Sequence, residues 1–310
     1  MHVPVLPGPA LEWLRVRPDG TYVDCTAGFG GHSELICERL TSGRLIAIDR
    51  DPLAVTRVRE RLQRFACAEV VQSDYGKLAR ILPELQVGPV DGVLIDAGVS
   101  SMQLDDPQRG FSFQVEGPLD MRQDTTQPLT ARAYFAACTE TELTRALRDY
   151  GDVRPAQRIA KSIVKRRERN TLNTTFDLRD AVCEALPFVN GTPDEVRTVF
   201  QAVRIAVNDE YAQLERGIRA GIEALAPAGR IVVIAFHSGE DRIVKNVFRE
   251  ESHAQRTFLA DGRTASVTPP RLRVLTPKPV TADADELLDN PRAHSAKLRA
   301  AERLAGKEAA

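Results

Sequence analysis

Short apolar runs alternate with amphipathic stretches over the first hundred residues. The apolar runs cover residues 21–25, 44–49, 69–72 and 90–96, and the stretches between them have the spacing of helices. Strands and helices in alternation predict a parallel sheet covered by helices, which binds its ligands beyond the carboxyl ends of the strands. We therefore expect the functional residues directly after each run.

The alternation stops after Asp96. Residues 98–124 are rich in Gly, Asp, Ser and Pro, and residues 130–187 have an almost wholly helical pattern. A long helix is expected over about 196–225, followed by a strong strand signal at 230–236. A last charged helix is expected near 293–304.

This pattern predicts a helical insertion within a sheet domain. We expect a discontinuous domain of residues 1–104 and 196–310, and an inserted helical substrate-recognition domain of residues 105–195. The fold class is therefore α/β, with a sheet that resumes after the insertion.

Composition excludes several classes of protein. The 310 residues are 43% hydrophobic, enough for a real core, and no apolar run approaches the ~20 residues that span a bilayer. The first residues lack the pattern of a secretion signal, so we expect a cytoplasmic protein without a membrane partner. The 5 cysteines are scattered, which indicates no metal site. The oligomeric state stays open, with a homodimer as one option.

A glycine-rich loop follows the first strand. Residues 24–33 read Asp-Cys-Thr-Ala-Gly-Phe-Gly-Gly-His-Ser, in which the glycines allow a tight turn close to a ligand. A dinucleotide fingerprint would place Gly where Ser33 stands, and an acidic residue precedes the turn. These differences favour S-adenosylmethionine over NAD, although such a loop can also serve only as a turn.

Polar residues close the next strands. Asp49 ends the second strand 19 residues after Gly30, where a carboxylate can accept hydrogen bonds from ribose hydroxyls. Tyr75 follows the third strand and either packs on the adenine or belongs to the rim of the core. Asp96 ends the fourth strand and faces either the methionine end of the cofactor or the reacting amine.

A basic stripe lies in the predicted insertion. Its members recur at steps of three or four residues, which places them along one side of a helix: Arg154, Arg158, Lys161, Lys165 and Arg169. The net charge of -1 hides this local excess. The stripe is either an RNA-binding surface that meets phosphates or a solvated helix face.

Several sequence blocks together resemble one family. They are Gly-Gly-His-Ser at 30–33, Asp-Ala-Gly-Val-Ser-Ser-Met-Gln-Leu-Asp at 96–105, Arg-Gly-Phe-Ser-Phe at 109–113, Gly-Pro-Leu-Asp-Met-Arg at 117–122, Phe-Gln-Ala-Val-Arg-Ile at 200–205 and Phe-His-Ser at 236–238. In this order they resemble the bacterial small-subunit ribosomal RNA cytosine-N4 methyltransferase family, RsmH or MraW. The resemblance covers nearly the whole chain.

The resemblance implies a Rossmann-like class I S-adenosylmethionine-dependent methyltransferase fold with an inserted helical domain. It implies methyl transfer to N4 of a cytidine in the decoding region of 16S ribosomal RNA, within the small ribosomal subunit. The family's cofactor contacts carry over to Gly30, Gly31, His32, Asp49, Asp96 and Gln103, with Tyr75 at a position that is usually aromatic.

An exocyclic cytosine amine is a poor nucleophile, so the enzyme must align it with the methyl group. A carboxylate that accepts a hydrogen bond from the amine would favour the reaction, and Asp96 is our candidate. Ser100 and His237 are further catalytic candidates. His237 is alternatively a structural residue at a strand end.

Some positions depart from the family pattern, among them Ala97, Met102, residues 193–197 and Gly239, where the family has Leu. They leave open a noncatalytic RNA-binding or ribosome-assembly factor that keeps the cofactor fold. A methyltransferase acting on DNA or a small molecule is a second alternative. A dehydrogenase is the weakest, because the loop lacks the third glycine.

Overall fold

The computed structural model describes residues 4–258 and 264–305. The chain divides into two compact units. The first joins Met1–Gly98 to Tyr211–Ala310, and the second is Val99–Glu210.

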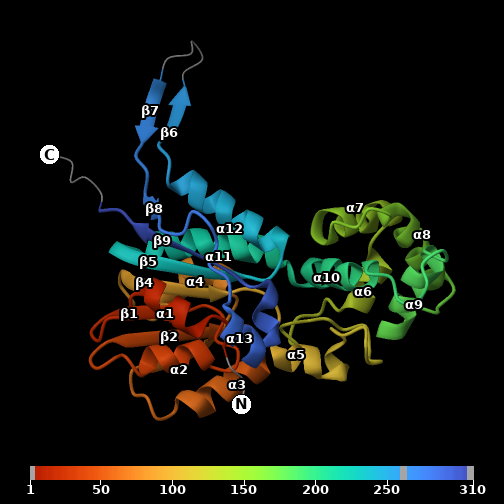
Figure 1. Cartoon of the computed structure of the whole chain (residues 1–310), viewed down its shortest axis with the longest axis horizontal. Coiled ribbons are helices and arrows are strands. Elements are labelled where there is room, and N and C mark those ends of the chain that lie inside the picture. The colour runs from red at the N-terminus through yellow and green to blue at the C-terminus, as the bar shows by residue number, and fades with distance from the viewer. Residues whose placement is uncertain (1–3, 259–263, 306–310) are drawn as a thin grey trace. The chain divides into compact units, whose positions relative to one another are not determined.

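The first unit is built on a parallel sheet with an antiparallel edge. Among the described residues the sheet has seven strands in the order β3-β2-β1-β4-β5-β9-β8. Their bounds are β1 Thr21–Asp24, β2 Arg44–Asp49, β3 Ala68–Gln72, β4 Val90–Asp96, β5 Leu225–Ala235, β8 Leu272–Val274 and β9 Lys297–Arg303. Strands β1 to β5 pair in parallel, and β9 runs antiparallel to both of its neighbours (Figure 1).

Helices cover both faces of this sheet, as the sequence predicted. One face packs on α1 (Pro7–Leu14), α2 (Gly31–Cys37) and α3 (Pro52–Leu62), and the other on α4 (Leu78–Glu84), α11 (Glu210–Ala224) and α12 (Ser238–Glu251). Alternate strand residues serve the two cores, so Val23 packs on one face and Tyr22 on the other. Short elements complete the unit: η1 Tyr75–Lys77, α13 Ala284–Asp289, η3 Pro291–Ser295 and the hairpin of β6 (Gln255–Phe258) and β7 (Thr264–Thr268).

The strand order reverses between β1 and β4. Chain connections leave the sheet in opposite directions at such a point, which opens a crevice at the carboxyl ends of the strands. This topology confirms the predicted Rossmann-like α/β fold. It also indicates where a ligand binds in the first unit.

The second unit is helical around its own apolar core. Its elements are α5 (Ser101–Asp105), η2 (Pro107–Arg109), α6 (Ala131–Ala137), α7 (Glu140–Gly151), α8 (Ala156–Glu168), α9 (Thr175–Ala185) and α10 (Glu195–Asn208). Capping boxes start α7 at Thr139 and α9 at Thr174, where each hydroxyl accepts the backbone N–H three residues later. The predicted helical insertion is therefore present.

The long helix expected over 196–225 is wrong, because the chain forms α10 and α11 instead. Asp209 lies between them with φ +51°, a left-handed conformation that ends α10. Helix α10 packs on α7 and belongs to the second unit. Along the chain, the units therefore divide at residues 98/99 and 210/211, whereas the sequence analysis expected 104/105 and 195/196. The expected ends at 1 and 310 lie outside the described residues.

The helix expected near 293–304 is also wrong. A short turn, η3, precedes β9, which lies between β5 and β8 in the sheet. Leu298, Ala300 and Ala301 are fully buried in this position. Hydrogen bonds to two neighbouring strands and burial of both faces outweigh the helical propensity of Leu, Ala, Lys and Glu.

No helix in the described ranges is long and apolar enough to cross a membrane.

Candidate active site

The glycine loop after β1 rests on a buried carboxylate. Asp24 accepts a hydrogen bond of 2.6 Å from the Ser33 hydroxyl and one of 3.1 Å from the Thr26 backbone N–H. Burial raises the pKa of Asp24, which the sequence had marked only as the acid before the turn. Gly28 and Gly30 have φ values of +52° and +76°, which glycine adopts without strain.

Asp49 ties the end of β2 to this loop. Its Oδ2 accepts from the Gly28 N–H at 2.8 Å, and its Oδ1 accepts from the Asp51 N–H at 2.9 Å. Burial raises the pKa of Asp49 to about 6, although both hydrogen bonds oppose this shift. Each oxygen keeps a second lone pair, so the carboxylate can still accept from a diol.

Tyr75 lies where β3 ends, at the start of η1. Its half-buried ring packs so closely on Gly217 of α11 that a Cβ at that position would collide with it. The adjacent Asp74 forms an ion pair of 2.9 Å with Arg50. Tyr75 is therefore held at the carboxyl edge of the sheet. This position is compatible with packing on the adenine and with a place at the rim of the core.

Asp96 ends β4 with one carboxylate oxygen unsatisfied. Its backbone N–H donates to the Thr26 hydroxyl at 2.6 Å, which links the loops after β1 and β4. Its Oδ2 lies 3.8 Å from Nδ1 of His32, whereas its buried Oδ1 has no hydrogen-bond partner among the described residues. Burial raises the pKa of Asp96 well above its ordinary value, and the charges of Asp24 and Glu240 add to this effect.

His32 is a buried neighbour of Asp96. Its Nε2 lies 2.9 Å from the Val5 carbonyl oxygen, and burial lowers its pKa. Because a carbonyl can only accept, Nε2 carries the hydrogen, and the neutral ring presents the lone pair of Nδ1 toward Asp96. Gly31, the preceding residue, packs against Pro4.

His237 begins α12 as its N-cap. Its Nδ1 accepts from the Glu240 N–H at 3.4 Å, and its Nε2 lies 3.1 Å from Glu240 Oε1 without the alignment of a hydrogen bond. Glu240 is 2% exposed, and its Oε2 accepts from the Phe236 N–H at 2.8 Å. These contacts give His237 a structural task, and the buried Glu240 is one of the charges that raise the pKa of Asp96.

Ser100 and Gln103 lie in the second unit and form a capping box at the start of α5. Gln103 N donates to the Ser100 hydroxyl at 3.3 Å, and Gln103 Oε1 accepts from the Ser100 N–H at 3.1 Å. Gln103 is 5% exposed. Both side chains therefore have a local structural role, which the family resemblance did not reveal.

The basic stripe lies on α8 and the residues that flank it. All five predicted members are exposed: Arg154, Arg158, Lys161, Lys165 and Arg169. By contrast, Arg166 forms an ion pair of 2.7 Å with Glu184, and Arg167 donates to the carbonyls of Phe135 and Cys138. The helix and its exposed face agree with the sequence, and RNA binding stays a prediction.

The first unit thus combines a reversed strand order, a glycine loop and carboxylates after β1, β2 and β4. The acidic groups suit a ligand that carries a sulfonium and an ammonium, and the unsatisfied Oδ1 of Asp96 leaves a place for a donor. Fold and site define an S-adenosylmethionine-dependent methyltransferase of the Rossmann-like class.

The particular family follows from comparison with known sequences. Residues 1–304 match the MraW methylase family, and the chain belongs to it. A relative from Trichlorobacter lovleyi is 46% identical over 98% of both chains. Another, from Methylococcus capsulatus, is 49% identical over 95% of this chain and 98% of its own. Both relatives are named ribosomal RNA small subunit methyltransferase H.

Among solved structures, a rRNA methylase from Streptococcus thermophilus covers 98% of this chain and 99% of its own, at 9% identity and a TM-score of 0.44. That likeness adds nothing to the fold assignment, which depends on the strand order. Family membership confirms the resemblance and removes the dehydrogenase as an alternative.

Proposed function

We propose that the protein transfers a methyl group from S-adenosylmethionine to N4 of a cytidine in the decoding region of 16S ribosomal RNA, within the small ribosomal subunit. Such a substrate would place the protein in the cytoplasm. The names of its relatives support the ribosomal substrate. The observation that carries the chemistry is the buried Oδ1 of Asp96, which lacks a hydrogen-bond donor at the carboxyl end of β4.

The cofactor site consists of the glycine loop and the strand ends. Asp49 would accept hydrogen bonds from the ribose hydroxyls, and Tyr75 would pack on the adenine. Gly30 and Gly31 allow close approach of the backbone, and His32 lies beside Asp96, with Nδ1 3.8 Å from its Oδ2. Gln103 is the contact that the family resemblance adds. The bound cofactor supplies an electrophilic methyl group on its sulfonium.

Asp96 acts on the nucleophile. Its Oδ1 accepts a hydrogen bond from the exocyclic amine, which aligns the nitrogen and increases its electron density. The nitrogen becomes positively charged as the new bond forms, so it must lose a proton, and the Asp96 carboxylate takes that proton. The alternative is that Oδ1 binds the ammonium of the cofactor instead.

His237 and Ser100 are positioning residues in this proposal. His237 holds the start of α12, and Ser100 holds the start of α5. Nδ1 of His237 and the Ser100 hydroxyl each accept a backbone N–H of their helix, and Nε2 of His237 lies against Glu240 without a hydrogen bond. Oδ1 of Asp96 has no such neighbouring task and no hydrogen-bond partner among the described residues. Substitution of either residue should therefore affect activity by disordering the start of its helix.

The exposed stripe on α8 binds RNA phosphates. Its five cations face solvent, and within the described part of the chain none of them forms an ion pair with an acidic side chain, unlike Arg166. Phosphate contacts position RNA without reading its sequence. The target base must leave its stack to reach a methyl donor, at a cost of roughly a few kcal/mol that these contacts help to offset.

A noncatalytic RNA-binding factor is the second candidate, and the departure at Gly239 is its main support. A Cβ at Gly239 would collide with the hydroxyl of Tyr211, so the phenol occupies the space that a larger side chain would need. The Tyr211 ring also lies 5.8 Å from the His237 ring, centroid to centroid. The Tyr211 side chain thus fills the space beside Gly239, which favours a catalytically active protein over the noncatalytic factor.

The test is a transfer assay. Purified protein and labelled adenosylmethionine are incubated with unmodified small ribosomal subunits, and the product is mapped by nuclease digestion and mass spectrometry. N4-methylcytidine at one decoding-region position is the expected result. Cofactor binding without label on subunits or on naked RNA would establish the noncatalytic factor instead.

A further inference from the structure

The second unit carries a basic cavity on its surface. The cavity has a volume of about 460 Å³ and is lined by Arg148 of α7 and by Arg154, Pro155, Gln157, Arg158 and Lys161 around the start of α8. None of these lining residues is acidic. Four cations around one hollow repel one another unless an anion lies between them, so the cavity suits a phosphate group.

An exposed aromatic ring adjoins the same cations. Phe188 follows α9 and is 69% exposed, which is unusual for a side chain of this size. The guanidinium of Arg158 lies 5.6 Å from the centroid of its ring, so Arg158 contacts both the cavity and the aromatic side chain. An open ring beside a phosphate site offers a surface on which a nucleobase can stack.

We propose that the cavity and Phe188 form a nucleotide-binding site for single-stranded RNA, with a backbone phosphate in the cavity and a base stacked on Phe188. The inference rests on the proposed function and refines it. It adds Arg148 and Phe188 to the RNA-binding residues. Within the stripe, Arg154, Arg158 and Lys161 line the cavity, whereas Lys165 and Arg169 do not. Stacking accepts any base, so the site anchors RNA without reading its sequence.

The first experiment tests the stack. The affinities of a labelled single-stranded RNA oligonucleotide and of an abasic oligonucleotide of the same length are measured by fluorescence anisotropy. Wild-type protein should bind the oligonucleotide with bases about fivefold or more tightly than the abasic one, the lower end of a typical stacking contribution. Phe188→Leu should lose most of this preference.

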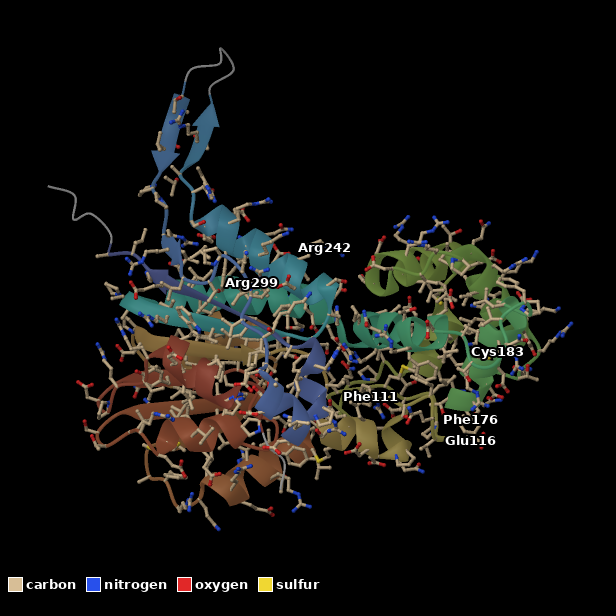
Figure 2. The ribbon with its side chains drawn as sticks, in the orientation of Figure 1. Phe111, Glu116, Phe176, Cys183, Arg242 and Arg299 are labelled. Atoms are coloured by element: carbon tan, nitrogen blue, oxygen red, sulfur yellow. The ribbon has the colours of Figure 1, made fainter. Side chains whose placement is uncertain are left out.

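The second unit provides a matched control for the ring. Phe176, labelled in Figure 2, also has a guanidinium over it, that of Arg179 at 3.9 Å, but it is half-buried and does not line the cavity. Phe176→Leu should keep the preference for bases. Equal losses in the two variants, or a wild-type protein without any preference, would overturn the proposed stack.

The second experiment tests the cavity. Arg154→Gln with Lys161→Gln removes two cavity cations, and Lys165→Gln with Arg169→Gln removes one Arg and one Lys from the flanking part of the same stripe. The cavity pair should weaken oligonucleotide binding at least about threefold more than the flanking pair, because cavity cations surround one phosphate. Equal losses would mean that only general positive charge matters and would overturn the cavity site. Thermal unfolding of each variant verifies that these exposed substitutions leave the fold intact.

Methyl transfer to small subunits is measured with the wild-type protein in parallel. Suppose that the protein prefers the oligonucleotide with bases and loses more affinity in the cavity pair than in the flanking pair, but transfers no methyl group. This outcome would overturn the proposed function and support the nucleotide site. Methyl transfer without a preference for bases would overturn the nucleotide site alone.

Discussion

Asp49 and Asp96 end the two strands that flank β1, and burial raises the pKa of both carboxyls. They differ in their partners. Asp49 accepts a backbone N–H on each oxygen, whereas Oδ1 of Asp96 has no partner within the described residues. The backbone therefore holds the Asp49 carboxylate in place, whereas Oδ1 of Asp96 can accept a hydrogen bond from a ligand. This difference supports the roles proposed for them, cofactor binding for Asp49 and the chemistry for Asp96.

Cofactor affinity should depend on the ionisation of Asp49. Its pKa of about 6 means that roughly a tenth of the carboxyl is ionised at pH 5, and a protonated carboxyl is a poorer acceptor for two ribose hydroxyls. We expect the Kd for adenosylmethionine to be roughly tenfold higher at pH 5 than at pH 7 by calorimetry at constant ionic strength. Asp49→Ala should bind adenosylmethionine weakly at both pH 5 and pH 7, and its Kd should not change between them. A wild-type Kd that does not change with pH would contradict this role.

Asp96→Asn should lower kcat by about 10²–10⁴-fold, because the amide cannot take the proton of the amine. The Kd for adenosylmethionine should stay close to that of the wild type. Single-turnover methyl transfer and equilibrium binding separate the two quantities. In the wild type the rate should fall as the pH drops through the raised pKa of Asp96, because only the carboxylate accepts a proton. A raised Kd with unchanged kcat would instead assign Asp96 to the ammonium of the cofactor.

At the scale of elements, β9 and α12 are joined by a bidentate ion pair. Arg299 of β9 is 7% exposed, and it donates to both oxygens of Asp241 on α12, at 2.6 and 3.1 Å. The pair fixes the start of α12 against the sheet, next to His237 and Glu240. Strand β9 thus supports the start of α12, where His237 and Glu240 lie.

Arg299→Ala should lower the free energy of unfolding by about 3–5 kcal/mol, because Asp241 would keep a largely buried charge without its partner. Urea denaturation of the two proteins measures this difference. Arg242, the neighbour of Asp241 on α12, is the control, because its side chain is exposed (Figure 2). Arg242→Ala should stay within about 0.5 kcal/mol of the wild type. Similar losses in both variants would show that the ion pair contributes little.

At the scale of the whole molecule, the two units carry different groups of candidate residues. The strand-end carboxylates and the glycine loop belong to the first unit, and the basic stripe belongs to the second. The insertion lies between residues 98 and 211 of the sheet unit along the chain. Cofactor binding and RNA binding should therefore respond to separate substitutions.

Arg158→Ala with Lys165→Ala should weaken binding of ribosomal RNA and leave the Kd for adenosylmethionine unchanged. If both cations meet phosphates, the slope of log K against log salt should become shallower by about 1.4, or roughly 0.7 per contact on a single strand. Filter binding over a salt series gives this slope. Asp49→Ala should show the opposite pattern, with weak cofactor binding and unchanged RNA affinity. Identical effects in the two variants would contradict the separation.

Much of the first unit could be predicted from the sequence alone. The period-two and period-3.6 patterns are local, so they identified β1 to β4, the strong second half of β5 and the helices of the insertion. Asp49 and Asp96 could be placed because parallel strands present their carboxyl ends at one edge of a sheet. The stripe on α8 followed from helical spacing in the same way.

Only the tertiary structure decided the rest, because the deciding contacts join residues far apart in the chain. The segment of β9 has helix-forming residues, and its pairing with β5 and β8 makes it a strand. The proximity of His32 to Asp96 and the unsatisfied oxygen of Asp96 depend on how loops from separate strands meet. Periodicity records which side of an element is apolar, but burial of a single polar atom is set by the packing of its neighbours.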